Sequence, residues 1–87
     1  MYEVHLSQQA DKYQQKLDKH LRERILNKLR TLAKNPTPSD TKLVGRNKQG
    51  EQIYRLRIGD YRALYSIKEN KQVLIAKIDK RPRVYDR

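Results

Sequence analysis

Apolar and basic residues alternate along residues 54–58, the alternation stops at Gly59-Asp60, and it resumes along residues 61–65. A period of two is typical of a half-buried strand, and a Gly-Asp pair between two such runs is typical of a tight hairpin turn. The predicted pairs are Ile58 with Tyr61, Arg57 with Arg62, Leu56 with Ala63, and Arg55 with Leu64. Arg57 and Arg62 then face each other, and this like-charge pair needs either an anion or screening by water to offset it.

The N-terminal part of the chain predicts a strand and two helices. Residues 2–6 alternate as a short half-buried strand does, and residues 8–33 carry apolar residues at steps of three and four, the period of an amphipathic helix. A single helix of that length would reach about 40 Å, whereas a domain of this size has a radius of gyration near 12 Å. We therefore expect an antiparallel helical hairpin that breaks at residues 18–20, with Ser7 and Asp18 as N-caps and an end at Asn35, before Pro36.

The rest of the chain predicts an irregular surface stretch at residues 35–52 and a third C-terminal strand at residues 72–79. A four-residue turn before that strand would put Arg62 opposite Lys77, Leu64 opposite Ile75, and Tyr65 opposite Leu74. The face toward the helices would then carry Leu56, Ile58, Tyr61, Ala63, Tyr65, Leu74, Ala76 and Ile78. The other face would carry a row of Arg57, Arg62 and Lys77, with Arg55 one row away and Arg81 just beyond the strand. A turn one residue shorter or longer would exchange the faces of the third strand.

These elements predict an α+β fold of order β-α-α-β-β-β, with an antiparallel sheet packed against the N-terminal helical hairpin. At 87 residues we expect one domain, residues 1–87, that rests on packing alone because it has no cysteine. We see no apolar run of roughly 20 residues and no secretory signal pattern, so we expect a cytoplasmic protein without a membrane partner.

The formal net charge of +11 indicates a polyanionic partner, which is nucleic acid, an anionic membrane or an acidic protein. Residues 45–87 carry 12 Lys/Arg against 5 Asp/Glu and four of the six tyrosines, and this mixture favours single-stranded nucleic acid. The chain has no Walker loop, no HExxH helix and no cluster with metal-ligand spacing, so we expect no metal and no other cofactor. A cationic face is sufficient for RNA cleavage by the substrate's own 2′-hydroxyl, but arginine, with a pKa above about 12, is a poor base.

The hairpin at residues 54–65, together with Lys80-Arg81-Pro82-Arg83-Val84-Tyr85, resembles the RelE toxins of the RelE/ParE superfamily. The resemblance covers the whole chain and implies a RelE-like, microbial-RNase-like domain. It also implies a toxin of a type II toxin-antitoxin system, held in check by a cognate antitoxin. The implied activity is metal-independent endonucleolytic cleavage of mRNA in the ribosomal A site, which inhibits translation, with contacts to ribosomal RNA.

The resemblance also implies roles for individual residues. The catalytic set is Arg57, Arg62, Arg81 and Tyr85, and the RNA-binding set is Arg55, Lys77, Lys80 and Arg83. Arg57 falls where some members have a lysine that acts as general base, and Lys80 falls where many have a histidine. Two alternatives stay open: a gyrase-targeting toxin of the ParE branch, and a non-catalytic basic module that binds RNA or the ribosome.

Overall fold

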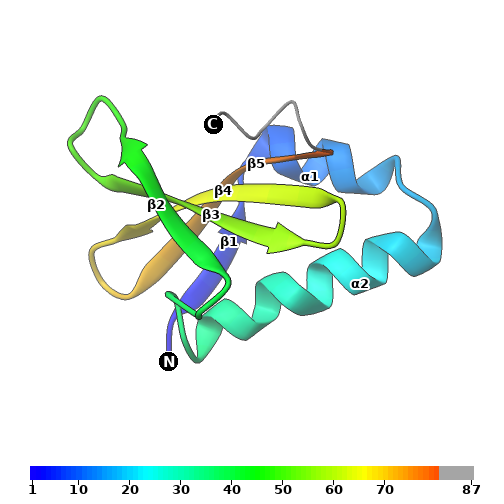
Figure 1. The fold of residues 1–87 in the computed structure, drawn as a ribbon, viewed down its shortest axis with the longest axis horizontal. Coiled ribbons are helices and arrows are strands. Elements are labelled where there is room, and N and C mark those ends of the chain that lie inside the picture. The colour runs from blue at the N-terminus through cyan, green and yellow to red at the C-terminus, as the bar shows by residue number, and fades with distance from the viewer. Residues whose placement is uncertain (81–87) are drawn as a thin grey trace.

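The computed structural model of the chain describes residues 1–80, which form a five-stranded sheet and two helices (Figure 1). In chain order the elements are β1 (Glu3–Leu6), α1 (Gln8–Gln15), α2 (Lys19–Arg30), a 3₁₀ turn (Thr31–Ala33), β2 (Thr41–Arg46), β3 (Gln52–Ile58), β4 (Tyr61–Lys68) and β5 (Gln72–Lys80). The strand order across the sheet is β1-β5-β4-β3-β2. None of the helices within these residues is long and apolar enough to span a membrane.

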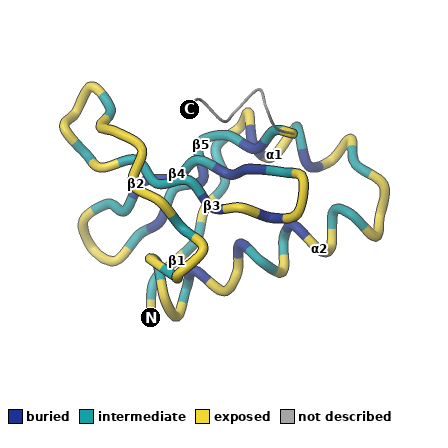
Figure 2. The backbone as a smooth tube through the Cα atoms, in the orientation of Figure 1, coloured by how far each residue is buried: buried dark blue, intermediate teal, exposed yellow. Residues whose placement is uncertain are grey.

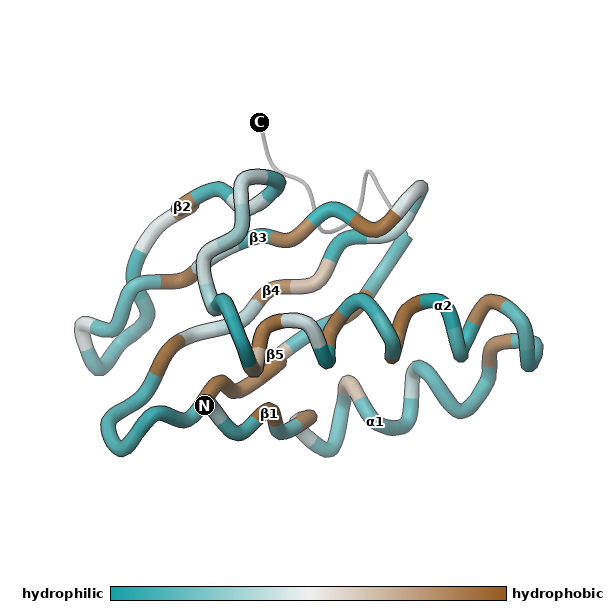
Figure 3. The backbone as a smooth tube through the Cα atoms, turned by 90° about the horizontal axis from the view of Figure 1, so that it is seen from below, coloured by the Kyte–Doolittle hydropathy of each residue, from teal (hydrophilic) through white to brown (hydrophobic). Residues whose placement is uncertain are grey.

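The α+β class and the helical pair are confirmed. Ser7 Oγ accepts a hydrogen bond from Ala10 N at 3.0 Å, and Asp18 Oδ1 accepts one from Leu21 N at 3.0 Å, so both predicted residues cap their helices. The helices run in opposite directions on one side of the sheet (Figures 1 and 3). The end of α2 differs from the prediction, because the chain tightens into the 3₁₀ turn after Arg30 instead of continuing to Asn35.

The sheet differs from the prediction in two respects. Strand β2 lies within the stretch that we expected to be irregular, and β1 pairs with β5 in parallel, so the sheet is mixed and has one strand more than predicted. Strand β2 carries no signal of burial, because it is an edge strand whose two large apolar residues, Leu43 and Val44, are 55% and 47% exposed.

The core lies between the helices and one face of the sheet (Figure 2). Its fully buried large side chains come from α2, the 3₁₀ turn and the three central strands. They are Ile25, Leu29, Leu32, Leu56, Tyr65, Val73 and Ile75. Packing of this one apolar face fixes which side chains of each strand are left on the opposite face.

The hairpin register is confirmed pair by pair. Ile58 pairs with Tyr61 and Arg57 with Arg62, across a turn in which Gly59 has a φ of 59°. A positive φ at the first position of a two-residue hairpin loop matches the twist of the strands and favours glycine there.

The register of β5 is wrong in the prediction. The turn between β4 and β5 has three residues, with Asn70 and Lys71 at positive φ, and Lys68 pairs with Gln72. A bulge at Ala76 then shifts the register again, so that Leu64 pairs with Lys77 and Arg62 pairs with Asp79. As a result Val73 and Ile75 are buried in place of Leu74 and Ala76, whereas Ile78 is buried as predicted.

Candidate nucleic-acid interface

The sheet face opposite the helices carries five basic side chains from four strands. Register assigns them to this face, which we call the cationic face: Lys42, Arg55, Arg57, Arg62 and Lys77. Lys42 pairs with Arg55, so β2 adds a second like-charge pair beside that of Arg57 and Arg62. Two such pairs in adjacent rows favour an anionic ligand more strongly than one pair alone.

Four of these cations line one pocket of about 230 Å³, together with Ser39 and Asp40. Lys42 and Arg57 are exposed and Arg55 is half-buried. Strand β2 and the residues just before it therefore complete a pocket of which the sequence predicted only the part contributed by the β3–β4 hairpin. A pocket with four cations and one carboxylate is suited to binding a phosphate group.

Arg62 is the innermost of these cations, with only 5% of its surface exposed. Its Nη1 donates hydrogen bonds to the carbonyl oxygens of Gly59 and Tyr61, both at 3.1 Å. The guanidinium therefore closes the hairpin turn as well as lining the pocket, and its position is fixed by the turn.

Asp40 is the carboxylate of this pocket, and no sequence pattern indicated it. Lys28 of α2 bonds to it, with Nζ 2.7 Å from Oδ2, and this hydrogen bond holds the pKa of the Asp40 carboxyl below its usual range. Asp40 is therefore an anion at neutral pH and a weak proton acceptor.

The sequence pattern assigned Asp79 to neither face of the sheet. In the structure it pairs with Arg62, at the position where we expected Lys77. Lys77 lies on the cationic face but one row away, level with Arg55 and Leu64. Tyr13 of α1 lies beside Asp79. Burial raises the pKa of the Tyr13 hydroxyl, and the negative charge of Asp79 raises this pKa further. The predicted row of three cations is therefore a row of two, ended by a carboxylate.

The remaining predicted residues lie at or beyond the end of β5. Lys80 is exposed and pairs with Tyr61, so the register assigns it to the opposite face of the sheet from Arg62. Arg81, Arg83 and Tyr85 lie outside the described residues. Among residues 1–80, no three His, Asp or Glu side chains come together as a metal site.

Comparison with protein families finds a match to a family described as "ParE toxin of type II toxin-antitoxin system, parDE", over residues 4–85. Among solved structures, the chain is similar to RelE in the archaeal RelE-RelB complex from Pyrococcus horikoshii OT3. The two are 31% identical with a TM-score of 0.80, over 94% of this chain and 97% of that one.

Two Escherichia coli structures are also similar. The isolated RelE toxin is 26% identical with a TM-score of 0.74, over 98% of this chain and 92% of that one. A chain of the intact RelBE toxin-antitoxin complex is 26% identical with a TM-score of 0.72, over 92% of this chain and 96% of that one. No curated protein matches the sequence.

Proposed function

The chain belongs to the ParE toxin family, within the RelE/ParE superfamily of type II toxins, and from its likeness to solved RelE toxins we propose that it is a ribosome-dependent endoribonuclease. It would cleave mRNA in the A site and so inhibit translation, in the cytoplasm where ribosomes work. The observation that carries the proposal is the pocket of Lys42, Arg55, Arg57 and Arg62 on one sheet face.

The proposed reaction uses the RNA's own nucleophile. The 2′-oxygen attacks the adjacent phosphorus, the bond from phosphorus to the 5′-oxygen breaks, and the leaving 5′-oxygen takes up a proton. Arg57 and Arg62 would stabilise the extra negative charge of the phosphorane, because fixed cations in a partly enclosed site act without reorganising. A group other than these two arginines accepts the 2′-hydroxyl proton, because a guanidinium stays protonated.

The other predicted residues have supporting roles in this proposal. Arg81 would neutralise the negative charge on the leaving oxygen, which takes its proton from water, and Tyr85 would stack on a base and orient the attack. Arg55, Lys77, Lys80 and Arg83 would bind the RNA backbone. Lys42 joins them, because it lines the same pocket as Arg55.

The test is inducible expression followed by mapping of mRNA ends in stalled ribosomes. We expect A-site ends with the wild type and at least a roughly 10²-fold loss of cleavage with Arg57→Ala, the scale of losing one transition-state contact. Arg62→Ala should lose cleavage too, but Arg62 also closes the hairpin turn, so its thermal unfolding must be measured alongside. Arg30→Ala, on an exposed position of α2 away from the cationic face, is the matched control.

Intact mRNA in stalled ribosomes would contradict the proposal, and ribosome binding without any cleavage product would favour a non-catalytic module. The family description favours a second candidate, a gyrase-targeting toxin of the ParE branch. Gyrase-dependent DNA damage with normal translation would support that candidate instead.

We also propose a cognate antitoxin as the physiological partner. The similar RelE chains of Pyrococcus horikoshii and Escherichia coli are in complexes with RelB. A domain of charge +11 favours an acidic partner, or one that offers an amphipathic helix and an extended arm. Co-purification with the product of a neighbouring short reading frame would test this.

A further inference from the structure

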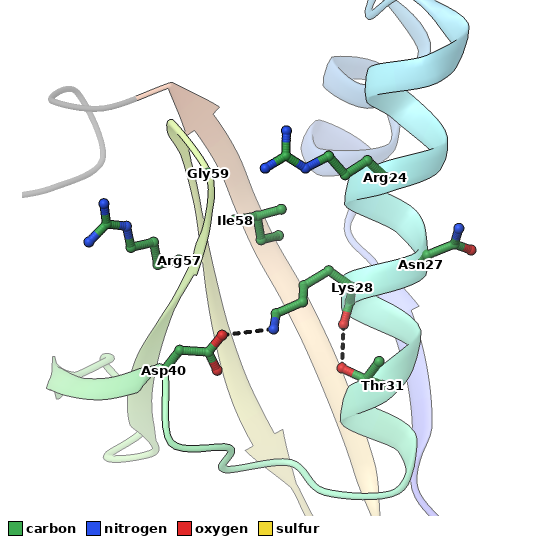
Figure 4. A pocket seen from close by; sticks show the side chains of 8 residues that line it. All are labelled: Arg24, Asn27, Lys28, Thr31, Asp40, Arg57, Ile58 and Gly59. Atoms are coloured by element: carbon green, nitrogen blue, oxygen red, sulfur yellow. Dashed lines mark hydrogen bonds and ion pairs between the residues drawn. The ribbon is translucent and has the colours of Figure 1, made fainter.

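A second pocket, of about 510 Å³, lies between α2 and the turn of the β3–β4 hairpin (Figure 4). One wall of the pocket is a face of α2 with Arg24, Asn27 and Lys28. The opposite wall is the end of β3. Arg24 and Lys28 are four residues apart, which puts both on the same face of the helix. Both side chains point from α2 toward the sheet in Figure 4.

The hairpin turn helps to place Arg24. A Cβ atom at Gly59 would fall 2.8 Å from Arg24 Nη2, so the guanidinium lies directly against the turn. Arg24 itself is exposed, and its charge is available at the mouth of the pocket.

This pocket adjoins the pocket of the cationic face. Asp40 and Arg57 line both, and Arg57 N donates a hydrogen bond to Asp40 O at 3.5 Å, so the two residues are in contact. The Arg57 side chain extends away from α2, on the far side of β3 from Arg24 and Lys28 (Figure 4). The two pockets therefore form a path that leads from Arg55 past Arg57 and around the end of β3, beside Asp40, to Lys28 and Arg24.

The charge along this path is strongly unbalanced. Among the described residues that line the two pockets, there are six lysines and arginines and one carboxylate, that of Asp40. That carboxylate already bonds Lys28, with a distance of 2.7 Å. A phosphate entering this second pocket meets Arg24 directly and competes with Asp40 for Lys28.

We propose that an RNA strand held on the cationic face continues past the end of β3 into this second pocket, where Arg24 and Lys28 bind the phosphate of a neighbouring nucleotide. The Asp40 carboxylate competes with that phosphate for Lys28. The inference rests on the proposed RNA-binding function of the cationic face. It favours RNA over an acidic peptide because the path joins a face that we propose to bind RNA, so a single ligand accounts for both pockets.

The test measures binding of a single-stranded RNA of about ten nucleotides, within the range of known single-strand sites. Its riboses are 2′-O-methylated, so that it has no nucleophile and is not cleaved. The affinity is measured over a range of KCl concentrations for each variant. The slope of log affinity against log salt reports the number of phosphate contacts, at about 0.7 for each contact to a single strand.

We expect Arg24→Gln and Lys28→Gln each to reduce the steepness of that slope by about 0.7. Arg30→Gln and Lys19→Gln, which remove charges of the same kind from exposed positions of α2 outside the pocket, should leave the slope unchanged. Asp40→Asn should strengthen binding about fivefold, because it removes the competing anion without removing a cation.

The outcomes separate the two proposals. If Lys42→Gln reduces the steepness of the slope while Arg24→Gln and Lys28→Gln do not, RNA stays on the cationic face and this inference is wrong. Weaker binding by Asp40→Asn would overturn the role of Asp40 as a competitor. A wild-type protein that does not bind the RNA would overturn this inference, whereas the proposed function is decided separately by the A-site ends mapped in stalled ribosomes.

Discussion

Tyr65 connects the segment before β2 to the centre of the sheet. It is fully buried, its hydroxyl donates to Pro36 O at 2.6 Å and lies 3.2 Å from Thr41 Oγ1, and its ring stacks on Tyr54 with centroids 5.5 Å apart. Asp40 lies between Pro36 and Thr41 in the chain. Tyr65 therefore holds in place the backbone that carries the carboxylate shared by the two pockets.

Tyr65→Phe should lower the free energy of unfolding by about 1–2 kcal/mol, because Pro36 O loses its buried donor. Denaturant unfolding at neutral pH measures the loss. Tyr54→Phe is the control, because the Tyr54 hydroxyl bonds only the exposed Gln52 side chain among the described residues, and phenylalanine keeps the stacking. An equal loss in both variants would contradict this role for Tyr65.

Burial raises the pKa of Tyr65 above its usual value, so the native state holds this proton more tightly than the unfolded chain does. As pH rises past about 10, the unfolded chain ionises first and stability falls. The wild type should therefore lose stability in this alkaline range, and Tyr65→Phe should lose less with pH. Unfolding free energies at neutral and alkaline pH check this, and parallel pH profiles for the two proteins would contradict it.

At the scale of elements, Ser7 joins α1 to the last strand. Its Oγ accepts from Ala10 N at 3.0 Å, as an N-cap, and donates to Ala76 O at 2.8 Å, at the bulge of β5. One hydroxyl therefore fixes the start of a helix and the point where the register of β5 shifts.

Ser7→Ala should cost about 2 kcal/mol, more than the roughly 1 kcal/mol of Asp18→Ala, because Ser7 loses a cap and a long-range hydrogen bond while Asp18 loses a cap alone. Denaturant unfolding of the two variants gives the comparison. Equal costs would mean that the bond to the bulge contributes nothing.

The elements that the sequence predicts correctly are those with local signals. The Gly59-Asp60 turn specifies the hairpin register by itself, and Ser7 and Asp18 mark where the helices begin. Strand β2 and the bulge at Ala76 have no such signal, because one is an exposed edge strand and the other depends on what packs beneath it. The predicted face of Lys77 was correct only because two register shifts, one in the turn and one at the bulge, cancel.

The candidate site divides in the same way. Arg55, Arg57 and Arg62 follow from the hairpin, whereas Lys42 and Asp40 come to the pocket through pairing of a strand that the sequence did not indicate. Arg24 and Lys28 look like ordinary solvated helix residues in the sequence. Only the position of α2 beside the hairpin turn gives them a common pocket with Arg57.

At the scale of the whole molecule, the chain carries a net charge of +11, and the described residues 1–80, with 18 Lys/Arg against 9 Asp/Glu, have a radius of gyration of 12.0 Å. Compact packing raises the mutual repulsion of these charges above that of the expanded unfolded chain. The fold therefore gains stability from any polyanion that binds it, and from salt.

The midpoint of thermal unfolding should rise with KCl, between about 0.01 M and about 1 M, as the Debye length falls from roughly 30 Å to roughly 3 Å. A gain of 1 kcal/mol corresponds to about 4–8 °C in a domain of this size. Lys48→Glu, at an exposed loop position, lowers the net charge from +11 to +9 and should raise the low-salt midpoint while reducing the salt effect. A midpoint that falls with salt would contradict this.

The parallel pairing of β1 with β5 also has a consequence for the order of events during synthesis. Strand β1 is made near the start of translation, but its only partner in the described sheet is β5, the last strand described. Residues 3–6 cannot pair until residues 72–75 have been made, and until then Val4 and Leu6 have no neighbouring strand beside them. Pairing over such a separation is slow to form. The first strand to be synthesised is thus among the last to be incorporated, and the sheet is completed only when translation of residues 1–80 is nearly over.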